Sequence, residues 1–345
     1  MTIIMKKTFK DISWDVSEEI YRKDKALSYS TIAKYERSGF NELESLFDKI
    51  ETPSLTFGSV VDSILTGGME EFEERFMVAE FPEVSETIIK IVKELFKLYN
   101  DSFSSLIEIP DNNILAVSNA ISYQMNWKPE TRAKVIREKG SEYYNLLFLS
   151  SNKTIIDTKT YTDALNAIDA LKTSAATKWY FELDNPFDSI ERYYQLKFKQ
   201  KLNNIEYRCM ADLIIIDHDK KEITPIDLKT SSKPEWDFYK SFIDWSYHIQ
   251  ARLYWRIIRK TMDEDEYFKD FKLNDYKFIV VNRKSLEPLV WIFPDTQTKG
   301  ELVYKDKTLR DPEVIGKELN YYLINSPKIP IGITGENNIV EWLIK

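Results

Sequence analysis

The chain has 345 residues and a formal net charge of −8, with 43% hydrophobic and 30% charged side chains. This length is ample for a buried core and corresponds to about two domains, while the composition excludes a disordered or collagen-like chain and the charge argues against a surface coated in basic residues. The single cysteine, Cys209, excludes a disulfide framework and a cysteine-ligated zinc or iron–sulfur site.

The N-terminal half of the sequence predicts mainly helices. After a mixed, charged arm over residues 1–27, a serine-capped helix is expected at 31–38 and ends at Gly39. Further helices are expected over 41–50, 54–67, 161–179 and most of 83–150, with a short acidic segment at 70–76 and a segment opened by Pro129 that reaches residue 139.

From residue 189 onward the sequence alternates as strands do. Strands are expected over 195–201, 205–216, 222–228, 276–281 and 289–293, with a long helix over 242–260 between them. This order predicts an α/β (α+β) protein with a helical N-terminal region. We expect an arm over 1–27, a mainly helical region over 28–180, a core over 181–300 and a C-terminal extension over 301–345.

Two aspartates and a lysine stand out in the expected hairpin of residues 205–228. A two-residue turn at Asp219 and Lys220 would place Asp212 directly opposite Asp227, with Cβ atoms about 4.5–5.5 Å apart. A four-residue loop centred one position earlier would keep both on one face, whereas a three-residue loop would separate them. Lys229 shares the face of Asp227 because side chains alternate along a strand.

Two carboxylates this close repel each other unless a proton or a cation lies between them. With two histidines in the chain, a metal would be held mainly by oxygen, which favours Mg²⁺ or Mn²⁺. The metal would polarise a phosphate and lower the pKa of a bound water, and the lysine would orient that water or hold a phosphate oxygen. The alternative is a solvated hairpin whose charged residues form a surface ion pair.

A wider set of motifs resembles the RecB-type branch of the PD-(D/E)xK nuclease superfamily, and within it the exonuclease VIII (RecE-type) proteins. The resemblance spans roughly residues 27–295. Its motifs are Asp212 with Asp227-Leu228-Lys229-Thr230, Gln250 with Tyr254, Leu27-Ser28-Tyr29-Ser30, Phe57-Gly58 with Asp62, and Glu71-Phe72 with Phe76.

The resemblance implies a restriction-endonuclease-like core, a central mixed β-sheet flanked by helices. It also implies that Gln250 and Tyr254 line the active site and touch the DNA backbone, and that Lys229 steadies the attacking hydroxide. The implied metal ligands are Asp212, Asp227, the carbonyl of Leu228 and Asp62, which stands where the branch usually carries a histidine. The alternative for Asp62 is the polar edge of an amphipathic helix.

Five other residues are weaker candidates for nucleic-acid contacts. Glu191 begins the strand before the hairpin and is either a metal or water ligand or an ordinary charged strand end. The remaining four are candidate phosphate contacts: Lys197, Lys199, Arg208 and Thr230. A solvated edge strand explains the lysines equally well.

The resemblance implies a Mg²⁺-dependent (or Mn²⁺-dependent) DNA exonuclease acting on duplex ends in phage-type recombination or DNA processing. A single-strand annealing protein and further copies of the chain are the implied partners. The alternatives are a catalytically weakened nuclease fold kept for binding, and a structure-specific endonuclease. We expect no membrane span and a cytoplasmic location, because no run of about 18 apolar residues occurs and the N-terminus lacks a secretory signal pattern.

Overall fold

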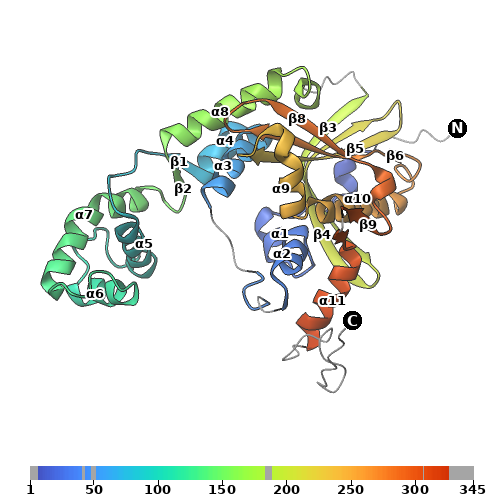
Figure 1. Cartoon of the computed structure of the whole chain (residues 1–345). Helices are drawn as coiled ribbons and strands as arrows, with labels where there is room; N and C mark the ends of the chain where they lie inside the picture. Colours follow the sequence, from blue (N-terminus) through green and yellow to red (C-terminus); the bar gives the residue numbers. More distant parts are fainter. Residues whose placement is uncertain (1–6, 41–42, 48–51, 183–188, 306, 326–345) are drawn as a thin grey trace. The chain divides into compact units, whose positions relative to one another are not determined.

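Figure 1 shows a computed structural model of the chain, which describes residues 7–40, 43–47, 52–182, 189–305 and 307–325. The chain forms two compact units. Residues 1–58 and 166–345 make up the first, called here the sheet unit, and residues 59–165 make up the second, the helical unit. The finer division predicted at residues 27, 180 and 300 stays a prediction.

The sheet unit is built on a mixed β-sheet, which confirms the predicted α/β class. The strands that join it within the described residues are β3 (Ile190–Leu202), β4 (Ile205–Asp217), β5 (Glu222–Ser231), β6 (Lys272–Leu273), β7 (Tyr276–Asn282) and β8 (Pro288–Phe293). Their order is β3-β4-β5-β7-β8, with β6 beside β5. Strand β5 is parallel to β6 and β7, and the other neighbours are antiparallel.

Helix α10 (Tyr247–Asp263) is the central helix of the sheet unit. It packs against β3, β4 and β7, and also against α2 (Tyr29–Ser38) and α11 (Pro312–Asn325) (Figure 1). Ile249, Leu253 and Ile257, one turn apart, are buried in the core that the helix shares with the strands. Because neighbours cover α10 on several sides, side chains that it directs at the sheet are held firmly.

The prediction of an uninterrupted helix over residues 242–260 is wrong. Helix α9 (Phe238–Asp244) ends before α10 begins, and Trp245 and Ser246 form the corner between them. Ser246 has a φ of 57°, in the left-handed region that a right-handed helix cannot contain. The hydrophobic spacing continues across the corner, and no glycine or proline marks it, so the break is not visible in the sequence.

Shorter elements complete the sheet unit. They are the 3₁₀ turns Phe9–Ile12, Lys178–Phe181, Glu235–Asp237 and Asp295–Gln297, helix α1 (Glu18–Lys23), and the antiparallel pair β9 (Leu302–Tyr304) and β10 (Lys307–Leu309). Helices α3 (Pro53–Asp62) and α8 (Thr158–Thr173) each have residues in both units. Half of the helix predicted over 41–50 lies outside the described residues, and over the described residues 43–47 the prediction is wrong, because the chain forms turns there.

The helical unit has a core of its own between α5 (Glu86–Tyr99), α6 (Asp111–Ala120) and α7 (Pro129–Leu149) (Figure 1). Pro129 opens α7 as predicted, but the helix runs ten residues beyond the expected end at 139. The unit also contains the π-helical turn Ser63–Gly67, α4 (Gly68–Arg75), and the short parallel strands β1 (Phe76–Val78) and β2 (Thr154–Ile156). None of the helices in the described ranges has the length and apolarity needed to cross a membrane.

His248, in the first turn of α10, makes the stability of the sheet unit sensitive to acid. Burial lowers its pKa to about 4, and the positive charges of Arg252 and Lys307 act in the same direction. Because an unfolded histidine has a pKa of about 6.5, the unfolded chain takes up a proton first as the pH falls. Acid from pH 6.5 to 4 should therefore lower the free energy of unfolding by about 3 kcal/mol through this residue.

Urea unfolding of the parent chain and of His248→Phe across this pH range tests the prediction. As the pH falls from 6.5 to 4, the free energy of unfolding of the parent chain should decrease more than that of His248→Phe. Parallel pH profiles for the two proteins would contradict it.

Candidate active site

The hairpin of β4 and β5 has the register expected from the sequence. Its ladder runs from the pair Asp217–Glu222 at the turn to the pair Leu213–Ile226. The next position would pair Asp212 with Asp227, so the two carboxylates lie where the ladder stops. Between the turn pair and this point the facing residues of β4 and β5 are apolar except for Thr224, and the aspartates lie immediately beyond them.

Asp212 bridges the strands on either side of it. Its Oδ2 accepts a hydrogen bond from the Leu228 backbone N–H at 2.8 Å, and its Oδ1 lies 3.5 Å from the Gln195 side-chain nitrogen. Gln195 has a φ of 53° and interrupts the pairing of β3 with β4 directly opposite Asp212. Gln195 could not be found from the sequence, because a glutamine within an alternating strand does not mark a left-handed conformation.

Asp227 is the buried charge of the site, with only 2% of its surface exposed. Its Oδ1 accepts a hydrogen bond from the Gln250 side-chain amide, and its Oδ2 lies 2.5 Å from the Lys229 ammonium. Gln250 comes from α10 and Lys229 from β5. Removing a carboxylate from water costs several kcal/mol, so these two donors are what make its burial possible.

Lys229 remains a cation in this environment. Burial alone would lower its pKa, but the charge of Asp227, together with Tyr247 and Asp212, outweighs burial and raises the pKa above its usual value. The ammonium also lies 4.9 Å from the centre of the Tyr247 ring. Its side chain is 18% exposed, so part of the lysine reaches solvent. Lys229 can therefore hold an anion or orient a water, but it is not a base at neutral pH.

Tyr29 and Tyr247 surround the lysine and were given no role from the sequence. Their rings lie 6.4 Å apart. Tyr29 follows Ser28, whose hydroxyl caps α2 by accepting the Thr31 backbone N–H. The cap thus fixes the start of the helix that brings Tyr29 to the site, which explains how the Leu27-Ser28-Tyr29-Ser30 motif is connected to it.

Gln250 and Tyr254 occupy the face of α10 that packs on the sheet. Gln250 is buried and directed at Asp227, and the buried Tyr254 meets Tyr276 edge-to-face with ring centres 6.3 Å apart. Gln250 is thus placed to position a carboxylate. The predicted contact of both residues with a DNA backbone stays a prediction.

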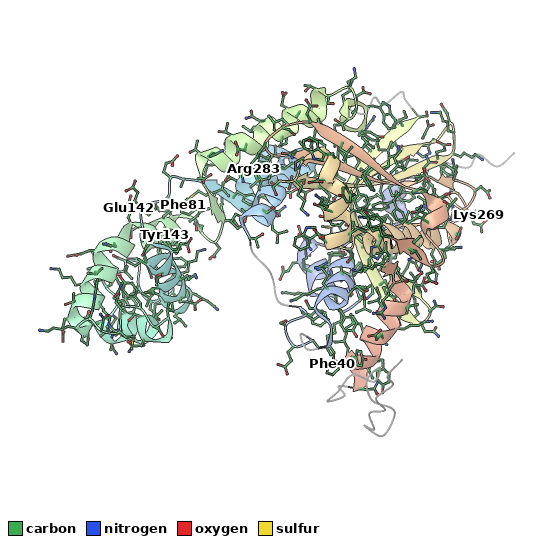
Figure 2. All side chains as sticks on the ribbon, viewed as in Figure 1. Phe40, Phe81, Glu142, Tyr143, Lys269 and Arg283 are labelled. Carbon is green, nitrogen blue, oxygen red and sulfur yellow. The ribbon has the colours of Figure 1, made fainter. Side chains whose placement is uncertain are left out.

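The Phe57-Gly58 motif reaches the strand end beyond Lys229. A Cβ added to Gly58 would lie 3.2 Å from Thr230 Oγ1, so the helix backbone approaches β5 closely. The Arg283 guanidinium, labelled in Figure 2, lies 4.5 Å from the centre of the Phe57 ring. Asp62 belongs to the helical unit, and its predicted metal role stays a prediction.

The other predicted nucleic-acid contacts are engaged elsewhere in the sheet unit. Glu191 pairs with the His218 ring at 3.1 Å and accepts the Tyr193 hydroxyl at 2.7 Å. Arg208 is buried and donates to the backbone carbonyls of Tyr21 and Ala26. These partners suit structural roles, and the predicted contacts stay untested.

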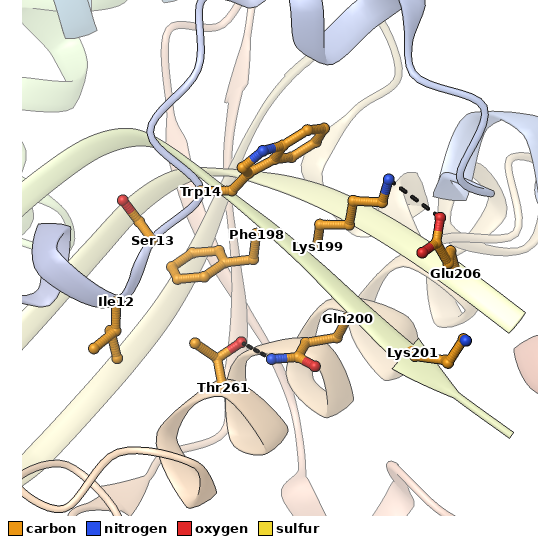
Figure 3. Close-up of a pocket in the computed structure, with 9 residues that line it drawn as sticks. All are labelled: Ile12, Ser13, Trp14, Phe198, Lys199, Gln200, Lys201, Glu206 and Thr261. Atoms are coloured by element: carbon orange, nitrogen blue, oxygen red, sulfur yellow. Dashed lines mark hydrogen bonds and ion pairs between the residues drawn. The ribbon is translucent and has the colours of Figure 1, made fainter. Parts of the chain in front are cut away.

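The two predicted lysines lie on β3, at the edge of the sheet. Lys199 pairs with Asp24 at 2.9 Å and Glu206 at 3.2 Å and lines a surface pocket of about 410 Å³ next to Trp14 (Figure 3). The Lys197 backbone carbonyl accepts the Trp14 N–H at 2.7 Å. None of the residues that line this pocket is Asp212, Asp227 or Lys229, so the pocket is separate from the carboxylates.

The donors at the end of the hairpin suit a hard cation. Asp212 and Asp227 supply carboxylate oxygens, and the Leu228 carbonyl points toward the same strand edge as its N–H, which reaches Asp212. In the described ranges, no group of three or more His, Cys, Asp or Glu is suitably placed to hold a metal. A metal would therefore take further ligands from the backbone or water and would compete with the Lys229 ammonium for Asp227.

Fold and site together define a mixed α/β protein whose central hairpin carries two carboxylates and a lysine. No protein-family model matches the chain, and no curated protein matches it. A solved structure of a presumed exonuclease from Eubacterium rectale is similar over 99% of this chain and 97% of that one, with 13% identity and a TM-score of 0.42. The protein SSO0001 is similar over 83% of this chain and 98% of its own, with 10% identity and a TM-score of 0.25. These likenesses do not assign the chain to a family.

The buried pair of Asp227 and Lys229 should show strong energetic coupling. Lys229→Met leaves the Asp227 carboxylate buried without its cation and should lower the free energy of unfolding by about 3 kcal/mol at neutral pH. Asp227→Asn removes the charge that needs compensation, so the double variant should regain much of this loss. Urea unfolding of the four proteins gives the coupling energy. Additive losses would show that the two groups do not form a coupled pair.

Proposed function

We propose that the chain is a metal-dependent deoxyribonuclease that hydrolyses phosphodiester bonds at the ends of duplex DNA. The observation that carries the proposal is the convergence of Asp212, Asp227 and Lys229 where the β4–β5 ladder stops. A solvated hairpin with a surface ion pair would not bury Asp227 or need a glutamine from α10 to hold it. Proteins bear the cost of a buried charge more often at functional sites than elsewhere.

The surroundings of each residue determine the role that we propose for it. Asp212, Asp227 and the Leu228 carbonyl would hold Mg²⁺ or Mn²⁺, which supplies polarisation of the phosphate and a more acidic bound water. Gln250 fixes the orientation of the Asp227 carboxylate. Lys229 stays protonated, so it would steady the attacking hydroxide or a phosphate oxygen by charge.

The finer features of the proposal come from the motif resemblance. They are an exonuclease acting in phage-type recombination or DNA processing, a single-strand annealing protein as partner, and a homo-oligomer as the working form. The hairpin chemistry does not depend on any of these. A chain that cut DNA internally would keep the same carboxylates and lysine.

The experiment is digestion of linear duplex DNA with Mg²⁺, beside EDTA and closed circular DNA. The parent chain should degrade linear DNA only, and EDTA should abolish the activity. Asp227→Asn and Lys229→Met should each lower the rate at least about 100-fold, the typical loss for one preorganised electrostatic group. Asp217→Asn is the matched control. It alters a carboxylate of the same hairpin that pairs with Lys220 at the turn, and it should leave the rate within about twofold.

Thermal unfolding of each variant separates loss of activity from loss of fold. Cutting of closed circles would replace end-directed cleavage with endonuclease activity. No cleavage with either Mg²⁺ or Mn²⁺ would overturn the proposed function and favour a nuclease fold kept for binding.

A further inference from the structure

Trp245 lies in the corner between α9 and α10, and its side chain is 52% exposed. The left-handed Ser246 that follows it turns the chain there. Non-glycine residues in this conformation are unfavourable and concentrate at functional sites. The corner thus holds a large aromatic ring half in solvent.

The corner is tied to the active site by a short chain of contacts. The Tyr29 hydroxyl donates to the Trp245 carbonyl at 2.7 Å, and the Tyr29 ring lies beside that of Tyr247. Tyr247 in turn faces the Lys229 ammonium. Two side chains, Tyr29 and Tyr247, therefore connect the Trp245 backbone to the Lys229 cation of the site.

Arg37 completes this surface. Its guanidinium donates to the Trp245 carbonyl at 3.1 Å and lies 5.3 Å from the centre of the indole ring. Arg37 is exposed, and none of the carboxylates in the described part of the chain forms an ion pair with it. An open indole beside an exposed guanidinium offers a stacking surface for a base and a charge for the adjoining phosphate.

We propose that Trp245 and Arg37 form a stacking platform for an unpaired nucleotide of the strand that enters the active site. The inference rests on the proposed function and narrows its substrate to DNA with a single-stranded or frayed end. The bases of an intact duplex are already stacked on each other and cannot lie on the indole. Every base has a flat face, so the platform selects unpaired strand rather than sequence.

Binding of a fluorescent 15-nucleotide DNA strand, measured by anisotropy in EDTA, tests the platform without cleavage. Trp245→Ala should weaken binding roughly 5- to 100-fold, the loss of one base–aromatic stack, and Trp245→Phe should restore most of it. Trp236→Ala is the matched control, because Trp236 is 76% exposed but lies in the preceding 3₁₀ turn, and it should change binding less than twofold. A blunt duplex should bind equally to all four proteins.

Arg37→Gln provides a second variant that leaves the ring in place. It should lower the slope of log Kd against log salt concentration by about 0.7, the value for one phosphate contact on a single strand. Thermal unfolding confirms that each variant is folded.

The outcomes separate this inference from the proposed function. If cleavage depends on Asp227 but Trp245→Ala binds the strand as well as the parent chain does, the stacking platform is overturned and the proposed nuclease function stands. If the strand binds through Trp245 but the chain never cleaves DNA, the stacking platform is supported and the proposed nuclease function is overturned. The platform would also be overturned if Trp245→Ala lost equal affinity for the single strand and for the blunt duplex, or if the parent chain did not bind the single strand.

Discussion

The arrangement of the sheet unit depends on the burial of one negative charge. Asp227 is almost fully removed from water, and it tolerates this only because Lys229 and Gln250 reach its two oxygens from different elements. The lysine comes from the same strand, two residues on, but the glutamine comes from α10. The helix must therefore keep its position against β5, since a shift by one residue along α10 would turn Gln250 away by about 100°.

The same constraint divides the hairpin into two parts with different physical roles. Between the turn and Leu213–Ile226, the buried side chains of Leu213, Ile214, Ile215 and Ile216 on β4 face Ile226, Pro225, Thr224 and Ile223 on β5 and stabilise the fold. Beyond that pair the ladder stops, and side chains replace backbone groups as hydrogen-bonding partners. The Leu228 N–H finds the Asp212 carboxylate instead of a strand carbonyl. The Asp212 carboxylate that accepts the backbone N–H could also bind a cation. The same oxygen atoms therefore serve both the stability of the hairpin and the proposed chemistry.

The sequence allowed this register to be predicted because strand periodicity is local. The turn residues and the continuous apolar run Leu213–Ile216 favour a register that places Asp212 beside Asp227, and a serine marks the start of α2. Contacts that join distant segments were not accessible in this way. The role of Gln250 depends on where α10 lies, and the departures at Gln195 and Ser246 are left-handed residues without a glycine to mark them. Both are conformations that the surrounding structure imposes against local preference.

The placement of the basic residues limits how such a site can hold a nucleic acid. Arg208 donates hydrogen bonds to backbone carbonyls. Lys199 pairs with Asp24 and Glu206, and Arg256 pairs with Asp311 and Glu313. With these three cations held by internal partners and a net charge of −8, counterion release from DNA would contribute less to affinity. Affinity must then come from short-range contacts at the site. In the proposed function, Lys229, the guanidinium of Arg37 and the flat face of Trp245 would supply charge and stacking there, and each depends on the corner and the strand end being held in place.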